Sequence, residues 1–266
     1  MRPVSACVIA FNEQEKLREC LESVSFCAEL VLVDSHSTDR TREIAAELGA
    51  RVIERDWPGH IEQKNFAIDQ ATHEWVLCLD ADERVTPELR AEIERALADP
   101  RADGYEVARR NIYLGRWIKH GGWYPDRKLR LFRRAKGRWG GVNPHDHVRV
   151  EGPVERLGGD LVHLSYDSIQ DHLKTIDYFS TIAAGEKLHR GQPAVGLQLL
   201  LNPPWKFLKM FLLQGGILDG WRGLIVATLG AFYVFLRYAK LWEMIHVEGR
   251  RRGEGGAFSY GRKGEP

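Results

Sequence analysis

The chain has little cysteine, and what it has argues against a disulfide-linked secreted protein. Its 266 residues contain four cysteines, and no two of them form a CxxC pair. Cys7 and Cys78 lie within strand-like apolar runs, where a free thiol behaves as a small buried hydrophobe. We therefore expect reduced cysteines and a cytosolic compartment.

Long apolar runs and a large net charge are missing as well. The apolar run near the N-terminus is too short for a signal peptide, and Glu13 follows it closely. The formal net charge is only +1, and we find no internal repeat. Apolar residues nevertheless make up 44% of the chain, which is enough for a sizeable core and argues against global disorder. The length suits one large domain, or one domain with appendages.

The small net charge hides an uneven distribution along the chain. Residues 1–100 contain 21 Asp or Glu against 11 Lys or Arg, a net charge of −10. Residues 101–140 contain 12 Lys or Arg against 3 Asp or Glu, a net charge of +9. This asymmetry predicts a basic wall that faces an anionic substrate, and the alternative is a solvated basic face.

Strand-like and helix-like segments alternate over the first 100 residues. Apolar runs of strand length occupy residues 4–10, 29–34, 51–55 and 74–79. Helical spacing occupies residues 12–24, 37–50, 60–72 and 86–99, with Ser37, Thr38 and Thr86 as possible N-caps and Pro87 at a first helical position. The alternation predicts βαβ units and an α/β fold with a mostly parallel sheet.

The pattern changes after Pro100. Three segments, 103–115, 127–134 and 145–152, have strand character without long helices between them, and residues 168–190 follow with helical spacing. The chain then becomes apolar and aromatic from Pro203, and it ends in a charged, glycine-rich tail at 249–266 that we expect to be disordered.

Polar side chains follow three of the expected parallel strands. Asn12 and Asp34 come after the first two, and "WVLCLDADERV" ends the fourth on Asp80 and Asp82. Ligands of parallel sheets bind beyond the carboxyl ends of the strands, where these side chains would meet. Mg²⁺ and Mn²⁺ prefer oxygen ligands and often bind one or two carboxylates together with substrate phosphates. The small Ala81 between the aspartates leaves room for a substrate.

Three motifs together resemble the family 2 glycosyltransferases with the GT-A fold. They are "VIAFNEQEKLRECLESV", "VLVDSHSTDRT" and "WVLCLDADERV", in the order and spacing of that family. Further segments, among them "GGWYPDRKLRLFRR" and "LVHLSYDSIQDHLKTIDYFS", resemble the WaaE/KdtX-like β-glycosyltransferases of the lipopolysaccharide core. Where that branch shows "VHE", this chain reads "NPHDHV". The resemblance covers almost the whole chain.

The resemblance implies a domain organisation. Residues 1–100 would form the nucleotide-sugar-binding half of a GT-A domain, and residues 101–165 its acceptor and catalytic half. Residues 166–248 would form a helical region with amphipathic or re-entrant membrane-associating helices, followed by the tail.

The resemblance also implies a donor site at the strand ends. Asp34 would bond the base or ribose, although turn aspartates are common at such positions. Lys64 would face the nucleotide or its diphosphate, the alternative being a solvent-facing helix lysine. Asp39 is better explained as a helix-start residue. The nucleotide would be lined by Ala10, Phe11, Asn12 and Glu13, with Ala81 beside them.

By the same resemblance, the enzyme needs Mn²⁺ or Mg²⁺ and inverts the anomeric centre. Asp82 would hold the metal on the diphosphate, and Asp80 would contact the ribose or the metal. The family makes UDP-glucose the leading donor. Asp146 is the first choice for the base that deprotonates the acceptor hydroxyl, and Asp126 the second. Donor phosphates or an anionic acceptor would be neutralised by Arg130, Arg133 and Arg134.

Other interpretations stay open at this point. His145 and His147 could bind zinc, although no third ligand is evident. "LDADERVT" imitates the first motif of haloacid-dehalogenase-like phosphatases, but three strand–helix units precede it and no "GDxxxD" follows. A catalytically silent sugar-nucleotide-binding protein on a membrane is a third possibility.

The segment from Pro203 predicts membrane association. Its apolar stretches, Phe207–Leu213 and Leu224–Leu236, are each shorter than the roughly 20 residues of a spanning helix. A turn at Gly215, Gly216, Asp219 and Gly220 separates them, and tryptophans, tyrosines, lysines and arginines flank them. We expect a peripheral or monotopic protein on the cytoplasmic face of a bacterial inner membrane, acting on a lipid-linked glycan, with no nucleic-acid partner. The alternative is a core helix of a soluble domain.

Overall fold

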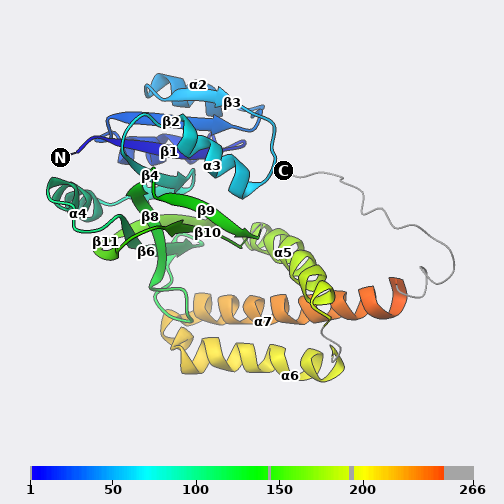
Figure 1. Ribbon diagram of the computed structural model, residues 1–266. Helices are drawn as coiled ribbons and strands as arrows, with labels where there is room; N and C mark the ends of the chain where they lie inside the picture. Colours follow the sequence, from blue (N-terminus) through cyan, green and yellow to red (C-terminus); the bar gives the residue numbers. More distant parts are fainter. Residues whose placement is uncertain (1, 143–144, 192–194, 249–266) are drawn as a thin grey trace. The chain divides into compact units, whose positions relative to one another are not determined.

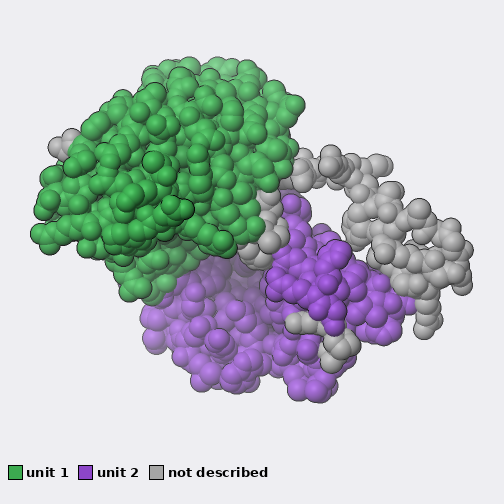
Figure 2. Space-filling model, viewed as in Figure 1, with its two compact units in different colours: residues 1–112, 125–165 green, residues 113–124, 166–266 purple. Residues whose placement is uncertain are grey.

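The computed structural model describes residues 2–142, 145–191 and 195–248, so the expected tail at 249–266 lies outside the described residues. The chain forms two compact units (Figure 2). Unit 1 comprises Met1–Ile112 and Pro125–Ser165, and unit 2 comprises Tyr113–Tyr124 and Tyr166–Pro266.

Unit 1 contains the expected parallel sheet, extended by antiparallel strands (Figure 1). Its strand order is β3-β2-β1-β4-β8-β6-β11-β5, and the first four strands in that order are parallel. The parallel strands are β1 (Val4–Ala10), β2 (Glu29–Asp34), β3 (Arg51–Glu54) and β4 (Trp75–Asp80). The others are β5 (Glu83–Val85), β6 (Gly104–Tyr113), β8 (Asp126–Arg133) and β11 (Val154–Tyr166), with a separate hairpin of β9 (Gly137–Val142) and β10 (His145–Val150).

The two faces of the sheet bury different side chains because strand residues alternate in direction. In β4, Trp75, Leu77 and Leu79 pack on one face, while Val76 and Cys78 pack on the other. The first face is covered by α1 (Leu17–Ser23), α2 (Thr41–Glu47) and α4 (Pro87–Ala98). The second is covered by α3 (His60–Gln70) and the β9–β10 hairpin. The alternation therefore places Asp80 on the face of α3.

Of the N-caps predicted for the first 100 residues, one is confirmed and two are not. Thr86 caps α4 as expected, because its Oγ1 accepts from the amide of Leu89. Ser37 and Thr38 do not cap α2, which begins four residues after Ser37, at Thr41. They belong instead to the turn after β2, where the Ser37 hydroxyl donates to Asp34.

Unit 2 is built from long helices and the short segment 113–124. It contains α5 (Ile169–His189), α6 (Val195–Leu208) and α7 (Gly220–Glu243), with the strand β7 (Arg116–Trp117). Short π-helical turns follow α6 (η1, Lys209–Leu213) and α7 (η3, Met244–Glu248), and a 3₁₀ turn precedes α7 (η2, Gly216–Asp219). One core cluster joins segment 113–124 to α7 through Tyr113, Ile118 and Val226.

The predicted turn between the two apolar stretches is confirmed. Gly215 and Gly220 take left-handed backbone angles, with φ of +70° and +62°, and α6 and α7 lie side by side on either side of the turn (Figure 1). Gly223 must lack a side chain, because a Cβ there would overlap the carbonyl of Gly216. By length and composition, the continuous helical run Gly216–Val247 could cross a membrane, and 28% of its most apolar stretch is buried.

Candidate active site

The turns after β1 and β2 are joined by hydrogen bonds between their polar residues. The amide of Asn12 donates to Ser37 Oγ at 2.9 Å, and Asn12 Oδ1 accepts from the amide of Thr38 at 2.8 Å. Asn12 has a left-handed φ of +54°, which asparagine tolerates better than most residues. The amide of Glu13 donates to Thr41 Oγ1 at 2.8 Å. These bonds fix the loop that was predicted to line a nucleotide.

Asp34 does not face outward from this loop. Its side chain is fully buried, and both carboxylate oxygens accept from Ser37, at 2.8 Å from the amide and 2.5 Å from the hydroxyl. This is the hydrogen bonding of a turn aspartate. This arrangement favours the alternative of a turn aspartate, and the contact between Asp34 and a base or ribose stays a prediction.

The rest of the loop exposes little apolar surface, and its polar group is the carboxyl group of Glu13. Ala10 and Ala81 are buried, and Phe11 is half-buried. Burial raises the pKa of Glu13 to about 7, and the nearby negative charge of Asp82 adds to the shift. Asp39 acts as a helix-start residue, because its carboxylate accepts from the amide of Thr41 at 3.0 Å.

Asp80 lies between two cations on the α3 face of the sheet. Its Oδ1 is 3.0 Å from Lys64 Nζ, and its Oδ2 accepts from Arg130 at 2.8 Å. Burial alone would raise the pKa of Asp80, but Lys64 and Arg130 outweigh it and hold that pKa well below its usual range. Since both oxygens are already bound to cations, the geometry gives no support to Asp80 as a metal ligand.

Lys64 links Asp80 to Asp146. Its side chain is 10% exposed, and its Nζ donates to Asp146 Oδ2 at 2.8 Å. The ammonium also lies 4.3 Å from the centre of the Trp139 ring. Burial would lower the pKa of Lys64, but Asp80 and Asp146 together raise it. The alternative of a solvent-facing lysine is therefore wrong, and the first candidate base is paired with a buried cation.

Arg130 is an internal counter-ion. It is 3% exposed, and its Nη2 contacts Glu83 at 2.5 Å as well as Asp80. Glu83 is fully buried and also faces Arg109 at 3.4 Å. Arg130 was predicted to neutralise substrate phosphates, but its contacts with Asp80 and Glu83 leave it little surface for that role.

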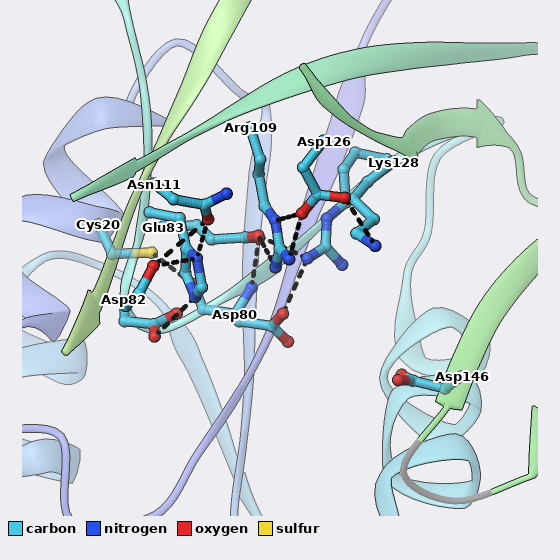
Figure 3. A network of polar contacts seen from close by, with 12 residues as sticks. Cys20, Asp80, Asp82, Glu83, Arg109, Asn111, Asp126, Lys128 and Asp146 are labelled. Carbon is cyan, nitrogen blue, oxygen red and sulfur yellow. Dashed lines mark hydrogen bonds and ion pairs between the residues drawn. The ribbon is translucent and has the colours of Figure 1, made fainter. Parts of the chain in front are cut away.

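Asp126, the second candidate base, belongs to the same network. Arg109 donates to its Oδ2 at 2.6 Å, and Lys128 lies 3.1 Å from its Oδ1 (Figure 3). Burial would raise the pKa of Asp126, but Arg109 and Lys128 outweigh burial and lower it. A carboxylate held by two cations is a weak proton acceptor.

Asp82 faces His163, a residue to which the sequence analysis assigned no role. Asp82 Oδ2 is 3.2 Å from His163 Nε2, and among the described residues its buried Oδ1 has no hydrogen-bond partner. His163 Nδ1 lies 2.7 Å from Asn111 Oδ1. Ser165 Oγ lies 3.0 Å from the same nitrogen, so contacts at Nδ1 orient the imidazole with Nε2 toward Asp82.

This pair fits a divalent cation. Adjacent ligands of an octahedral ion, each about 2.1 Å from the metal, lie about 3 Å apart, close to the observed separation. Asp82 and His163 would supply two ligands, and no group of three or more His, Cys, Asp or Glu suited to a metal occurs among the described residues. The donor's phosphates and water would complete such a site.

The structure does not bring Arg133 and Arg134 to this edge. In the antiparallel register of β4 with β8, Arg133 lies opposite Trp75, at the far end of β4 from Asp80. Its guanidinium pairs with Glu74 and with Asp103. Strand direction thus places these two arginines at the other end of the sheet from Asp80, and this placement gives no support to their predicted role toward donor phosphates.

Internal pairing also accounts for most of the predicted basic wall. Many basic side chains of residues 101–140 pair with acidic side chains, some within the same segment and some elsewhere in the chain. These pairs include Arg110 with Asp160, Lys136 with Asp103 and Arg138 with Asp69, besides those of Arg109, Arg130 and Arg133.

The structure gives no support to a zinc site. His147 Nε2 lies 3.2 Å from Arg149 Nε, as an acceptor would. The side chain of His145 lies outside the described residues.

The sequence analysis assigned no role to three residues of the site, Glu83, Arg109 and His163. Glu83 could have been identified, because it follows the two aspartates directly in "DADE". Arg109 and His163 carried no local signal. His163 reaches Asp82 only because β11 pairs with β5, with His163 opposite Glu83.

Comparison with known proteins finds a matching family model and several similar sequences. Residues 5–150 match the model of Glycosyl transferase family 2. The chain is 33% identical to the lipopolysaccharide core biosynthesis glycosyltransferase LpsC of Rhizobium meliloti, over 93% of this chain and 95% of that protein. It is 31% identical to an uncharacterized glycosyltransferase of Rickettsia typhi, over 92% of this chain and 88% of that one.

Solved structures give more distant matches. One is TarS of S. aureus, with 21% identity, a TM-score of 0.40, and coverage of 50% of this chain and 28% of that chain. Another is glucosyl-3-phosphoglycerate synthase of Mycobacterium tuberculosis with Mn²⁺, UDP and glucosyl-3-phosphoglycerate. It has 23% identity, a TM-score of 0.36, and coverage of 41% of this chain and 44% of that chain. This chain thus spans less than half of either.

Proposed function

The chain belongs to glycosyl transferase family 2, and we propose that it transfers a hexose, with inversion, from a nucleotide-diphosphate sugar to a lipid-linked glycan of the lipopolysaccharide-core type. The similarity to LpsC supports this choice of acceptor class. Family membership also removes the support for the phosphatase interpretation of the DxD motif. UDP-glucose is the donor to test first.

The observation that carries the proposal is the Asp82–His163 pair. One buried oxygen of Asp82 has no hydrogen-bond partner among the described residues, and the other lies 3.2 Å from the imidazole of His163. A divalent cation, Mn²⁺ or Mg²⁺, held there would offset the charge that develops on the diphosphate leaving group. The loop of Ala10, Phe11, Asn12 and Glu13 would lie beside the nucleotide, at the carboxyl ends of the strands.

Asp146 is the proposed base, in preference to Asp126. Asp126 is bound to both Arg109 and Lys128, whereas Lys64 is the single cation paired with Asp146 among the described residues. If Lys64 turned toward the donor's diphosphate, it would free Asp146 to accept the proton of the acceptor hydroxyl.

Membrane association is supported by an exposed apolar stripe on unit 2. Its residues recur at helical spacing along α6 and η1: Leu197, Leu201, Trp205, Leu208 and Leu212, each 44–66% exposed. Leu218 and Trp221, at the turn, are 72% and 81% exposed. A contiguous apolar surface flanked by Lys209 and Arg222 has the composition of an interfacial helix. It favours a protein held on the cytoplasmic leaflet, where a lipid-linked acceptor would be found.

A thermal-shift panel tests the donor site. UDP, UDP-glucose and other nucleotide sugars, each with and without Mn²⁺, should raise the melting temperature only where they bind the folded chain. We expect a Mn²⁺-dependent shift for UDP, lost in Asp82→Asn and reduced in His163→Gln. Asp69→Asn removes the charge of an exposed carboxylate that pairs with Arg138 and is the matched control. An unchanged shift in Asp82→Asn would remove the metal assignment, and release of labelled glucose onto a lipid acceptor tests the transfer itself.

A further inference from the structure

Unit 2 contains a pocket that the proposed reaction does not use. Its volume is about 210 Å³, and all of its lining residues belong to unit 2. Most of the lining is apolar or aromatic: Trp123, Tyr166, Ile176, Phe179, Met210, Val226, Leu229 and Tyr233. An apolar cavity of about 150 Å³ is enough for benzene, so this pocket has room for several carbon atoms of a chain.

One cation lines this pocket without a counter-ion. Lys206 is half-buried, and among the described residues no carboxylate or other acceptor pairs with it. Burial lowers the pKa of Lys206, and the neighbouring cations Lys209 and Arg237 lower it further. The charge of Glu186 raises the pKa of Tyr233, but it does not contribute to the shift in the pKa of Lys206. Lys206 thus lines an apolar pocket with two other cations near it, and no anion among the described residues is paired with it.

The other ionisable side chain of the lining does not balance it. His172 is buried, and its Nδ1 lies 3.2 Å from the hydroxyl of Tyr113. Burial lowers the pKa of His172 to about 4, so the imidazole is neutral near pH 7. A ligand for this pocket therefore needs an anionic group for Lys206 and an apolar portion for the aromatic lining.

We propose that the unit 2 pocket binds an anionic amphiphile, with its apolar chain against Tyr166, Phe179 and Met210 and its phosphate or carboxylate at Lys206. Lys206 directly follows Trp205 of the exposed apolar stripe, so the head group would sit where that stripe meets water. The pocket is distinct from the stripe, which needs only bulk lipid. The inference stands whether or not the chain transfers a sugar.

The test uses soluble probes and the full chain in a non-ionic detergent at fixed concentration. Octyl phosphate, octanol and inorganic phosphate are titrated by isothermal calorimetry. Octyl phosphate should bind more tightly than either partial probe. A hydrogen bond to a charged group is commonly worth a factor of about ten or more in affinity. Lys206→Met should therefore weaken octyl phosphate binding at least tenfold and leave octanol binding nearly unchanged.

Two further variants locate the site. Lys209→Met, three residues away and outside the lining, is the matched charge control and should change octyl phosphate affinity by no more than about twofold. Thr175→Trp fills the pocket from α5 and should abolish binding of both octyl phosphate and octanol. Circular dichroism checks that each variant is folded.

Each remaining outcome would overturn the proposal. Equal affinity for inorganic phosphate and octyl phosphate would mean a simple anion site without an apolar subsite. Equal affinity for octanol and octyl phosphate would remove the role of Lys206. Unchanged binding in folded Thr175→Trp would mean that the probe binds the exposed stripe instead. If octyl phosphate binds as expected, nanodiscs that contain either anionic phospholipid or lipid-linked glycan would distinguish the two natural sources of the ligand.

Discussion

Replacing Lys64 with methionine tests the charge arrangement at the centre of the candidate site. The change keeps most of the length of the side chain and its packing near Trp139 but removes the ammonium. Asp80 would keep Arg130 as a partner, whereas Asp146 would lose the ammonium that lies 2.8 Å away. Asp80 and Asp146 would also be left within about 6 Å of each other, since each lies within 3.0 Å of the same Nζ.

The magnitude follows from these contacts. Two like charges about 6 Å apart repel by about 3 kcal/mol at an effective dielectric constant of about 20. Breaking a buried ion pair by removing one partner commonly costs about 3–5 kcal/mol. Because the Asp146 side chain is 15% exposed and Asp80 keeps Arg130, we expect the lower end, a loss of about 3 kcal/mol in the free energy of unfolding.

Urea unfolding of the full chain, followed by tryptophan fluorescence, measures this loss. The double variant Lys64→Met with Asp146→Asn should recover most of it, because it removes the second charge of the pair. Lys136→Met is the control. Lys136 lies 2.8 Å from Asp103 but is 45% exposed, so its loss should cost less than about 1 kcal/mol. If the double-mutant cycle gave a coupling below about 0.5 kcal/mol, the buried ion pair would not be what stabilises this site.

Three further predictions concern the base, acidity and the membrane. Asp146→Asn should leave UDP affinity nearly intact and lower turnover by about 10²–10⁴-fold, and a larger loss in Asp126→Asn would reverse the two roles. The pKa of His172 is lowered by burial to about 4, below the ordinary value near 6.5. The unfolded chain therefore binds more protons between these values. His172 thus contributes stability above pH 6.5 that is lost as the pH falls toward 4, by roughly 3 kcal/mol. His172→Gln should flatten that part of the stability curve, and an unchanged slope would mean that His172 is not the cause. The double variant Leu218→Ser with Trp221→Ser should weaken sedimentation with anionic liposomes, and binding that survives it would place the contact elsewhere.

The sequence predicted the parallel half of the sheet well because each strand there carries its own signal. The runs at 4–10 and 29–34 match β1 and β2, and Thr86 caps α4 as expected. Such features depend on local sequence. Apolar runs of strand length predict the strands, a threonine before a proline predicts the helix start, and glycines predict the turn.

The contacts of the site residues could not be predicted in this way. The roles of Asp34, Arg130 and Arg133 were predicted from residue type and position along the chain, but their contacts depend on which face of the sheet they occupy and on charges far away in sequence. Arg130 meets Asp80 because β8 runs antiparallel beside β4, and His163 meets Asp82 because β11 closes against β5. No local pattern specifies those pairings.

The buried ion pairs around Asp80 have a consequence for how a donor would be selected. Four cations there are matched by four carboxylates: Lys64, Arg109, Lys128 and Arg130 against Asp80, Glu83, Asp126 and Asp146. Such a site offers no surplus positive potential to draw in a bare nucleotide diphosphate, and the carboxyl groups of Glu13 and Asp82 beside it would repel one. A diphosphate that arrives with its divalent ion carries little net charge and meets no such barrier. Selection would then favour the metal complex over free nucleotides in the cell, and capture of the donor would depend only weakly on ionic strength.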